Sequence, residues 1–389
     1  MWEVYASNPT SSLFKIETRR EMESPAFTVC PRPGVSDSHL ASMGLHIGNL
    51  DSKNAKYIQR DARKTVYDVF RETRVRIQDI WLNSVARGRS DDNNANCNVV
   101  YAVSYDRHGR EILHTPCGRW EETLFSSRIF CMLEFCWCYT LYPNITMRMG
   151  ADSGVISLSF NTTILMNRLE SLEEVNVFVD DPRLAGTDLR FLTLGKRITL
   201  HGGSSVFLHA SLREMHLLDK TKEPCDDRPS YSQVKCVSAC LDGLLMERVK
   251  CVIPDMMYGG KATGEGKPKC NSSEEVGEFM GRVARFRAEA ESELRNCSCP
   301  QPCLLREYHL SQVPGSISRL TSDPHRIFLD IQFPTTKVET FKEQPATSLV
   351  EILSEIGGCV GVCLGLSILT VYEILEVSFF FLCSRVKGF

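Results

Sequence analysis

The sequence predicts an α+β protein in which a disulfide-rich domain precedes one membrane helix near the C-terminus. Three observations support this class. The chain contains 17 cysteines in 389 residues, a density typical of proteins that fold in an oxidising compartment. Strand-like and helix-like segments are mixed without a βαβ rhythm, which favours α+β over α/β. One long apolar run lies near the C-terminus.

The composition is that of an ordinary globular protein, with 43% hydrophobic and 24% charged residues. It excludes collagen-like and disordered classes. The net charge of -3 provides no bulk basic field, so no nucleic-acid partner is predicted. Four Asn-x-Ser/Thr triplets agree with an outward-facing domain and mark glycosylation candidates at Asn144, Asn161, Asn271 and Asn296.

The elements can be predicted in chain order. Residues 1–34 are expected to be extended, with prolines between short strand-like stretches. Apolar residues at helical spacing predict helices over residues 62–85, 231–249 and 274–294. Period-two alternation predicts strands over residues 155–160, 175–179, 192–200, 205–209 and 326–333. The last of these strands should bury one face.

The apolar run from Ile356 to Leu382 contains no Lys or Arg. At about 1.5 Å per residue, a helix of this length crosses a bilayer core of about 30 Å with some tilt. Basic residues follow, and they mark the cytoplasmic side. We therefore expect an extracellular domain over 1–350, a membrane helix over 351–383 and a cytoplasmic tail over 384–389. The alternative is a buried core helix.

The N-terminus does not explain how such a domain reaches the oxidising side. Residues 1–10 have no basic and apolar leader, and no second long apolar run is present. We expect that the sequence lacks its natural beginning. Secretion by an unusual route is the alternative.

The cysteines from Cys225 to Cys303 have spacings that allow a set of nested disulfides. Two lie four residues apart on a predicted helix, and two lie two residues apart in an extended segment, so each pair shares a face. The simplest antiparallel solution joins Cys225–Cys303, Cys236–Cys299, Cys240–Cys297 and Cys251–Cys270. Eight cysteines allow on the order of a hundred connectivities, so spacing favours this one modestly. Zinc ligation is the competing interpretation.

Several motifs occur along the chain in a fixed order. They include Cys297-Ser-Cys-Pro-Gln-Pro-Cys303 with Tyr308, the strand 327–333 and the segment 354–373. Upstream lie the segments 24–30 (SPAFTVC), 138–141 (CYTL) and 177–182 (VFVDDP) and the spacing of Tyr231, Cys236 and Cys240. Together these motifs, from about residue 5 to 385, resemble the degenerin/epithelial sodium channel family, which includes the acid-sensing channels.

The resemblance implies a fold and further disulfides. The family has an extracellular β-sheet palm with a helical finger and thumb, and three subunits surround a pore lined by the second membrane helix. Its disulfide pattern agrees with the nested ladder, with a thumb over about 225–303. It adds Cys30–Cys138 and Cys97–Cys117, which leaves Cys131 and Cys136 as an additional pair.

The resemblance also implies roles in the C-terminal segment. Its selectivity filter matches Gly365, Leu366 and Ser367, where three copies would present carbonyl and hydroxyl oxygens to sodium. Ser354 lies where the family requires a small side chain for pore closure. Helix packing is assigned to Gly357, Gly358 and Gly361. The acidic candidates are Glu351 and Glu355 at the outer mouth and Glu373 and Glu376 in the pore. The alternative for Glu351 and Glu355 is a solvated helix end, and the alternative for Glu376 is a position at the cytoplasmic interface.

The chain also departs from the family pattern. The family's first membrane helix and its cytoplasmic His-Gly motif are absent from the sequence. Cys359 and Val362-Cys363 are unusual for the second helix. Lys222 and Asn8 stand where acid-sensing members have a tryptophan and its tyrosine partner, which does not favour their type of coupling.

The predicted function is that of a subunit of a trimeric, non-voltage-gated, amiloride-sensitive sodium channel in the plasma membrane. The expected partners are sodium ions, membrane lipid and other subunits of a homo- or heterotrimer; no cofactor is expected, and an extracellular ligand is left open. The alternative is a non-conducting, membrane-anchored binding or regulatory subunit. No enzyme is predicted. Pro268 stands where a phosphate-binding loop over 260–267 would need Ser or Thr. His201-Gly-Gly203 is similar to an oxyanion motif, but the sequence contains no Gly-x-Ser-x-Gly nucleophile elbow to accompany it.

Overall fold

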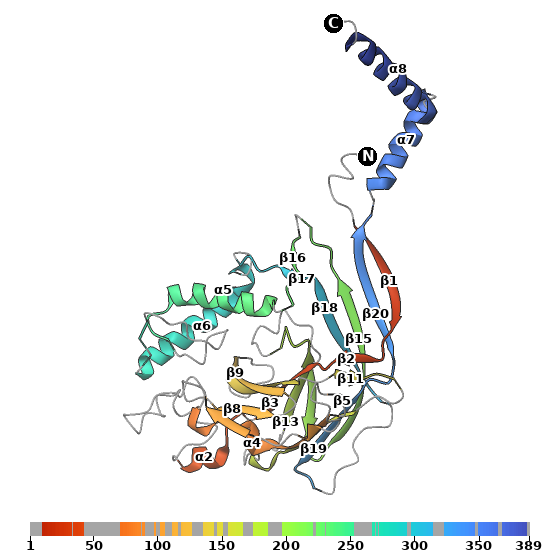
Figure 1. Ribbon diagram of the computed structural model, residues 1–389. Coiled ribbons are helices and arrows are strands. Elements are labelled where there is room, and N and C mark those ends of the chain that lie inside the picture. Colours follow the sequence, from red (N-terminus) through yellow and green to blue (C-terminus); the bar gives the residue numbers. More distant parts are fainter. Residues whose placement is uncertain are drawn as a thin grey trace. The chain divides into compact units, whose positions relative to one another are not determined.

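The computed structural model shows a mixed α+β protein (Figure 1). It describes residues 10–32, 34–42, 71–86, 88–89, 97–98, 102–105, 111–115, 118–126, 135–143, 146–150, 155–165, 174–185, 197–220, 223–229, 231–252, 267–268, 270, 272–293, 297–313, 323–346, 349–364 and 368–386. The chain divides into two units, one formed by Phe14–Phe341 and one by Met1–Leu13 with Lys342–Phe389. The α+β, disulfide-rich class predicted from the sequence is confirmed.

The larger sheet has eight strands in the order β1-β20-β15-β19-β12-β4-β6, with β18 paired to β15. Its strands are β1 (Thr10–Thr18), β20 (Lys337–Pro345), β15 (Ser205–His216), β19 (Arg326–Gln332), β12 (Val155–Asn161), β4 (Trp81–Ala86), β6 (Cys97–Asn98) and β18 (Leu304–Gln312). β15 and β19 are parallel, whereas β15 pairs with β18, and β12 with β19 and β4, in antiparallel fashion. Neighbouring strands are therefore mostly distant in sequence.

The second sheet has seven strands in the order β14-β13-β3-β10-β9-β8-β7. Its strands are β14 (Arg197–His201), β13 (Glu174–Asp180), β3 (Ala26–Arg32), β10 (Phe135–Pro143), β9 (Gly118–Ser126), β8 (Glu111–Thr115) and β7 (Ala102–Tyr105). The Cys30–Cys138 disulfide joins the adjacent strands β3 and β10. β13 is buried along its whole length, polar residues such as Asn176 included.

Two small sheets complete the β structure. One contains β2 (Glu21–Glu23), β11 (Thr146–Arg148) and β5 (Gly88–Arg89), and the other contains β16 (Cys225–Asp226) and β17 (Gln301–Pro302). Gly150, directly after the first of these sheets, has φ of 102°, and a Cβ there would lie 2.8 Å from Thr336 Cγ2. Only glycine fits this turn.

The core is made by the inward faces of both large sheets. Alternate residues of β12 and β19 are fully or almost fully buried, as period-two patterning requires: Ile156, Leu158, Phe160, Ile327, Leu329 and Ile331. Trp81 of β4 packs edge-on against Phe160, with ring centroids 5.3 Å apart.

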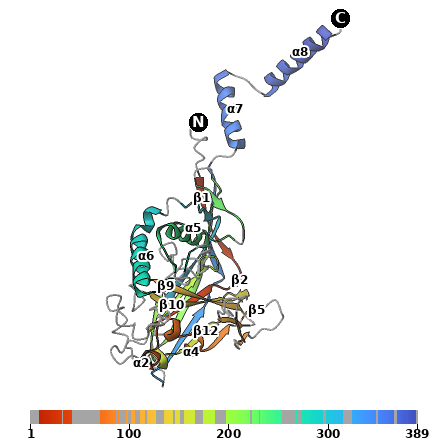
Figure 2. The same cartoon turned by 90° about the vertical axis from the view of Figure 1, so that its left-hand side faces the viewer.

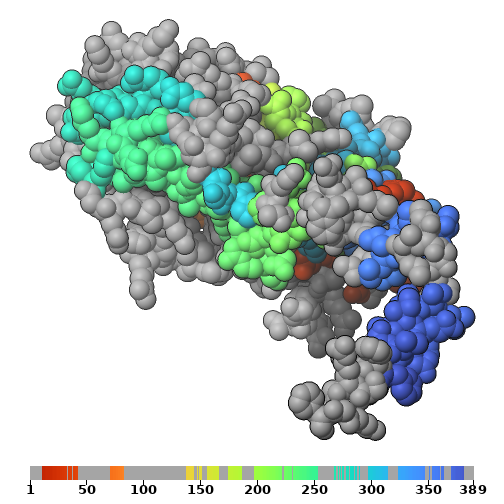
Figure 3. Space-filling model, turned by 90° about the horizontal axis from the view of Figure 1, so that it is seen from above, coloured from red at the N-terminus to blue at the C-terminus, as the bar shows by residue number. Residues whose placement is uncertain are grey.

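The helices α5 (Gln233–Arg248) and α6 (Ser273–Glu293) lie side by side (Figures 1 and 3). α5 begins after Ser232, whose hydroxyl accepts a hydrogen bond from the backbone N–H of Lys235 at 3.3 Å, as an N-cap does. Phe279, Val283 and Phe286 of α6 recur on one face and are buried. Residues 225–303, which contain both helices, are called the thumb segment below.

The shorter helices are α2 (Asp37–Ser42), α4 (Ile77–Ile80) and the 3-10 turn η3 (Thr163–Leu165). The prediction of one helix over 62–85 is wrong at its C-terminal end, because Trp81–Ala86 is strand β4. Pairing with β12 overrides the helical spacing of the apolar residues there. Residues 62–70 lie outside the described residues.

The C-terminal segment forms α7 (Leu349–Leu364) and α8 (Ile368–Val386) (Figure 2). The predicted membrane helix over 351–383 is thus described as two helices. Residues 365–367, between them, lie outside the described residues. Among the residues that the structure describes, no helix is both long and apolar enough to cross a membrane.

Candidate functional site

The two C-terminal helices carry large apolar side chains that have no protein cover. Those of α7 include Val350, Leu353, Ile356 and Val362, and those of α8 include Leu369, Val371, Tyr372, Ile374, Leu375, Val377, Phe379 and Phe380. Val362 is 88% exposed. Since contiguous apolar surface on a protein marks a contact with lipid or another protein chain, these helices are the first part of the candidate site.

The small and acidic residues predicted for the pore lie on the same helices. Ser354 and Glu355 are exposed on α7, as are Glu373 and Glu376 on α8. Gly357 and Gly358 face open space, because an added Cβ would meet nothing within 4 Å, and Gly361 is half-buried. The side chain of Glu351 and the predicted filter residues Gly365, Leu366 and Ser367 lie outside the described residues.

The cysteines of α7 and α8 have no assigned role. Cys359 is free and exposed on α7. The side chains of Cys363 and Cys383 lie outside the described part of the helices, so the structure adds nothing to their sequence assignment.

The thumb segment is held by four nested disulfides. They are Cys225–Cys303, Cys236–Cys299, Cys240–Cys297 and Cys251–Cys270, as the spacing and the resemblance both predict. Cys236 and Cys240 lie on one face of α5 and reach the extended segment 297–299. Because both rungs connect the same helix to the same segment, the ladder fixes the helix against rotation as well as separation.

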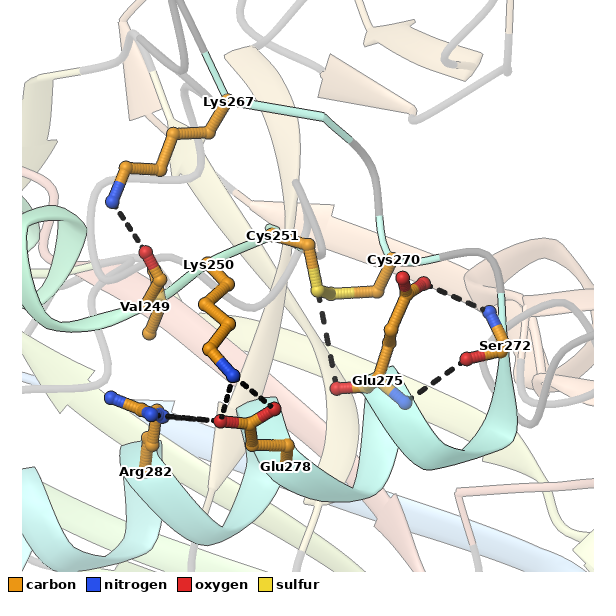
Figure 4. The surroundings of a disulfide bond; sticks show 9 residues. All are labelled: Val249, Lys250, Cys251, Lys267, Cys270, Ser272, Glu275, Glu278 and Arg282. Carbon is orange, nitrogen blue, oxygen red and sulfur yellow. Dashed lines mark hydrogen bonds and ion pairs between the residues drawn. A yellow bond between two sulfur atoms is a disulfide. The ribbon is translucent and has the colours of Figure 1, made fainter.

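A charged cluster fastens α6 to the end of α5 (Figure 4). Glu278 accepts hydrogen bonds from Arg282 at 2.7 Å and pairs with Lys250 at 3.2 Å. The Arg282 guanidinium, and Lys250 after it, hold the pKa of the Glu278 carboxyl below its usual range. Lys267 Nζ donates to the carbonyls of Met246 and Val249, where a cation complements the C-terminal end of a helix.

The base of the thumb segment is also tied to its surroundings. Asp226 accepts bidentate hydrogen bonds from Arg228, which lowers the pKa of its carboxyl. The Tyr231 hydroxyl donates to the carbonyl of Pro300 at 2.7 Å. The hydroxyl of the buried Ser232 donates to the carbonyl of Arg183. The last contact links the start of α5 to the turn that follows β13.

A buried carboxylate, Glu214 of β15, binds two arginines from other strands and turns. It is 2% exposed, and its oxygens lie 2.7 Å from Arg19 Nη2 and 3.3 Å from Arg306 Nε. Arg306 stands directly opposite Glu214 in the β15–β18 register and also pairs with Glu23 at 2.5 Å. These four residues, Arg19, Glu23, Glu214 and Arg306, are called the Glu214 cluster.

Further polar groups lie beside the Glu214 cluster. His216 Nε2 lies 3.6 Å from Glu214 Oε2, and Glu17 pairs with Arg19 at 3.0 Å. The hydroxyl of Tyr308 is buried and has no hydrogen-bond partner within the described residues. Burial raises the pKa of Tyr308 well above its usual range, so this side chain stays neutral.

Sequence reasoning missed the Glu214 cluster, although a signal existed. Leu208, Ala210, Leu212 and Glu214 follow one another at period two, and all four are buried. A carboxylate at the fourth position of an otherwise apolar row must find a cationic partner. The sequence does not say which arginine supplies it, since Arg19 and Arg306 come from distant parts of the chain.

A search of protein families gives the decisive observation. The family model described as amiloride-sensitive sodium channel matches residues 1–377. The chain belongs to the amiloride-sensitive sodium channel family. The resemblance recognised from its motifs is thus confirmed, and the family is one of ion channels, not of enzymes.

Relatives of this amiloride-sensitive sodium channel family member include several acid-sensing channels. Acid-sensing ion channel 4-B of Danio rerio is 21% identical over 433 aligned positions, covering 98% of this chain and 68% of that protein. Acid-sensing ion channel 1B of Danio rerio is 27% identical over 178 positions, covering 41% and 30%. Acid-sensing ion channel 1 of Gallus gallus is 26% identical over 165 positions, covering 39% and 29%. The chain thus spans about two thirds of the first relative and under a third of the others.

One solved structure aligns along nearly the whole chain. A proton-activated chloride channel covers 98% of this chain and 90% of its own, at a TM-score of 0.28 and 8% identity. Such a likeness is too low to carry an argument about either fold or function. Of the remaining sequence assignments, Lys222 and Asn8 lie outside the described residues. So do Cys117 and Cys131 and the side chains of Cys97 and Cys136, so the two further predicted disulfides stay predictions.

Proposed function

We propose that this member of the amiloride-sensitive sodium channel family is a subunit of a trimeric sodium channel of the plasma membrane, blocked by amiloride-like drugs. Its β-sheet palm and disulfide-braced thumb would face the cell exterior. The observation that supports this most directly is the pair α7 and α8. Their apolar side chains are exposed, and the helices are separated at Gly365-Leu366-Ser367.

This arrangement suits a pore helix that opens at its filter. Each helix alone is about 24 to 28 Å long at 1.5 Å per residue, which is below the bilayer core of about 30 Å. Together, with the link between them, they would reach across. If the helix opens at this filter, its backbone carbonyls and the Ser367 hydroxyl would be groups of the kind that replace the water shell of a cation.

The acidic residues would make the proposed pore negative and therefore attractive to cations. Glu373 and Glu376 are exposed on α8, and in a trimer three copies of each would form a cation-attracting ring. A carboxylate inside a membrane helix is costly unless it faces water or a partner. Glu351 and Glu355 would extend the negative field to the outer mouth.

The test is the sodium current of the protein when it is expressed at the surface of cells that carry no such current themselves. Ser354→Val should produce a constitutive, amiloride-blocked current, because a branched side chain prevents the helices from closing. Ser354→Ala is the matched control and should close normally. Surface-expressed trimers that carry no current with either residue would refute the channel proposal and favour a non-conducting binding or regulatory subunit.

A further inference from the structure

The triplet Asn161-Thr162-Thr163 lies where β12 ends and η3 begins. The side-chain oxygen of Asn161 accepts two hydrogen bonds from Thr163, one from its backbone N–H at 3.0 Å and one from its hydroxyl at 2.6 Å. The amide nitrogen of Asn161 makes no hydrogen bond within the described residues, and it is not among their buried, unpaired polar atoms. It therefore reaches solvent.

Thr162, between Asn161 and Thr163, anchors the triplet. Thr162 is buried, and both its backbone N–H and its hydroxyl donate to the carbonyl of His325, at 2.8 and 2.9 Å. Leu165, three residues later, is buried as well. Asn161 is half-buried and Thr163 is exposed. The chain thus holds Thr162 inward and leaves the amide nitrogen and the Thr163 hydroxyl accessible.

We infer that Asn161 carries an N-linked oligosaccharide. This rests on the proposed function in one respect only, that the domain is made in the secretory pathway. A glycan added during synthesis must project into solvent once the chain has folded, because a large hydrophilic group cannot enter the core. The amide nitrogen of Asn161 meets this condition, whereas Asn144, Asn271 and Asn296 lie outside the described residues.

The chemistry requires a polyprenyl-diphosphate oligosaccharide as the donor. The amide nitrogen of Asn161 forms a bond to C1 of the terminal sugar and loses one proton. The bond from C1 to the diphosphate oxygen breaks, and the diphosphate leaves with the electron pair. A hydroxyl at the third position is required by the acceptor motif, and Thr163 supplies it.

A glycan here would restrict how subunits assemble. Asn161 stands opposite Arg326 in the β12–β19 register, so the sugar would emerge at this end of the eight-stranded sheet. That end must then face solvent in the trimer, since a subunit contact there would have to displace the glycan.

The test is site occupancy in the whole chain, expressed in mammalian cells without any added targeting signal. The peptide that contains Asn161 is analysed by mass spectrometry after enzymatic deglycosylation in heavy-oxygen water, which labels each formerly occupied Asn. We expect most copies of Asn161 to be labelled. Thr163→Ser should keep the label, whereas Thr163→Ala and Asn161→Gln should remove one glycan from the protein.

Two negative results have different meanings. An unlabelled Asn161 alongside label at any of the other three triplets would overturn this inference and leave the extracellular placement intact. Absence of label at all four triplets would overturn both. The wild-type measurement decides either way, so the result does not depend on the variants folding.

Discussion

Replacing Glu214 by glutamine should destabilise the protein by about 3 kcal/mol. The substitution keeps the shape of the side chain and removes the charge that faces Arg19 at 2.7 Å and Arg306 at 3.3 Å. Breaking a buried ion pair costs about 3–5 kcal/mol, because the partner charge is left uncompensated. Here Arg19 is 33% and Arg306 21% exposed, and Glu17 and Glu23 still pair with them, so we expect the lower end of that range.

The assay is thermal unfolding of the complete protein in detergent at a fixed heating rate, because disulfide-rich membrane proteins often unfold irreversibly. With an unfolding entropy of roughly 2.1 cal/mol/K per residue, a domain of about 330 residues should lose about 4 °C. Glu223→Gln is the matched control. Glu223 is 79% exposed and pairs with Lys220 at 3.5 Å, and such a surface pair contributes about 0–1 kcal/mol.

Removing the charge of Arg306 as well as that of Glu214 should recover part of the lost stability. In Glu214→Gln combined with Arg306→Gln, fewer unpaired charges remain, so the two effects should not add. If Glu214→Gln lowers the unfolding temperature no more than Glu223→Gln does, the carboxylate is not the centre of a buried ion cluster and the reasoning is refuted.

Two further predictions concern the thumb segment. Replacing Cys240 and Cys297 by serine should lower the free energy of unfolding, measured with denaturant, by about 2.5 kcal/mol. An isolated disulfide that closes a loop of that length would contribute about 4 kcal/mol, but here the neighbouring Cys236–Cys299 bridge already closes most of the loop. A loss as large as the isolated value would show that the two disulfides act independently. Arg228 depresses the pKa of Asp226, so the stability from this pair is present above the ordinary carboxyl pKa of about 4 and is lost as pH falls through the depressed value. The difference in unfolding temperature between wild type and Asp226→Asn should therefore shrink below about pH 4, and a constant difference down to pH 2 would contradict this.

The disulfide ladder could be predicted in part because the spacing of its cysteines is local. Side chains four apart on a helix and two apart in a strand each share a face, so spacing modestly favours pairing Cys236 and Cys240 with Cys299 and Cys297, and the family resemblance points to the same pairs. Strand positions such as Ile327, Leu329 and Ile331 are also local, since alternation alone shows which face is buried.

The order of the strands could not be predicted, because pairing is set by contacts between distant segments. β15 lies between β20 and β19 and also pairs with β18, and nothing in the sequence of Ser205–His216 specifies these neighbours. The end of α7 at Leu364 and the start of α8 at Ile368 are not visible in hydropathy, because hydropathy is averaged over a long window.

The thumb segment adjoins the two strands that carry Glu214 and Arg306, β15 and β18, and this links the two features physically. Cys303, bridged to Cys225, is three residues before Arg306 on the chain, and its carbonyl accepts a hydrogen bond from the backbone N–H of Leu217 at 2.7 Å. Leu217 is in turn three residues after Glu214. A displacement of the thumb base therefore acts on both strands within three residues of the ion pair between them. Because such coupling travels through packed, bonded contacts, a thumb movement would strain the Glu214–Arg306 pair.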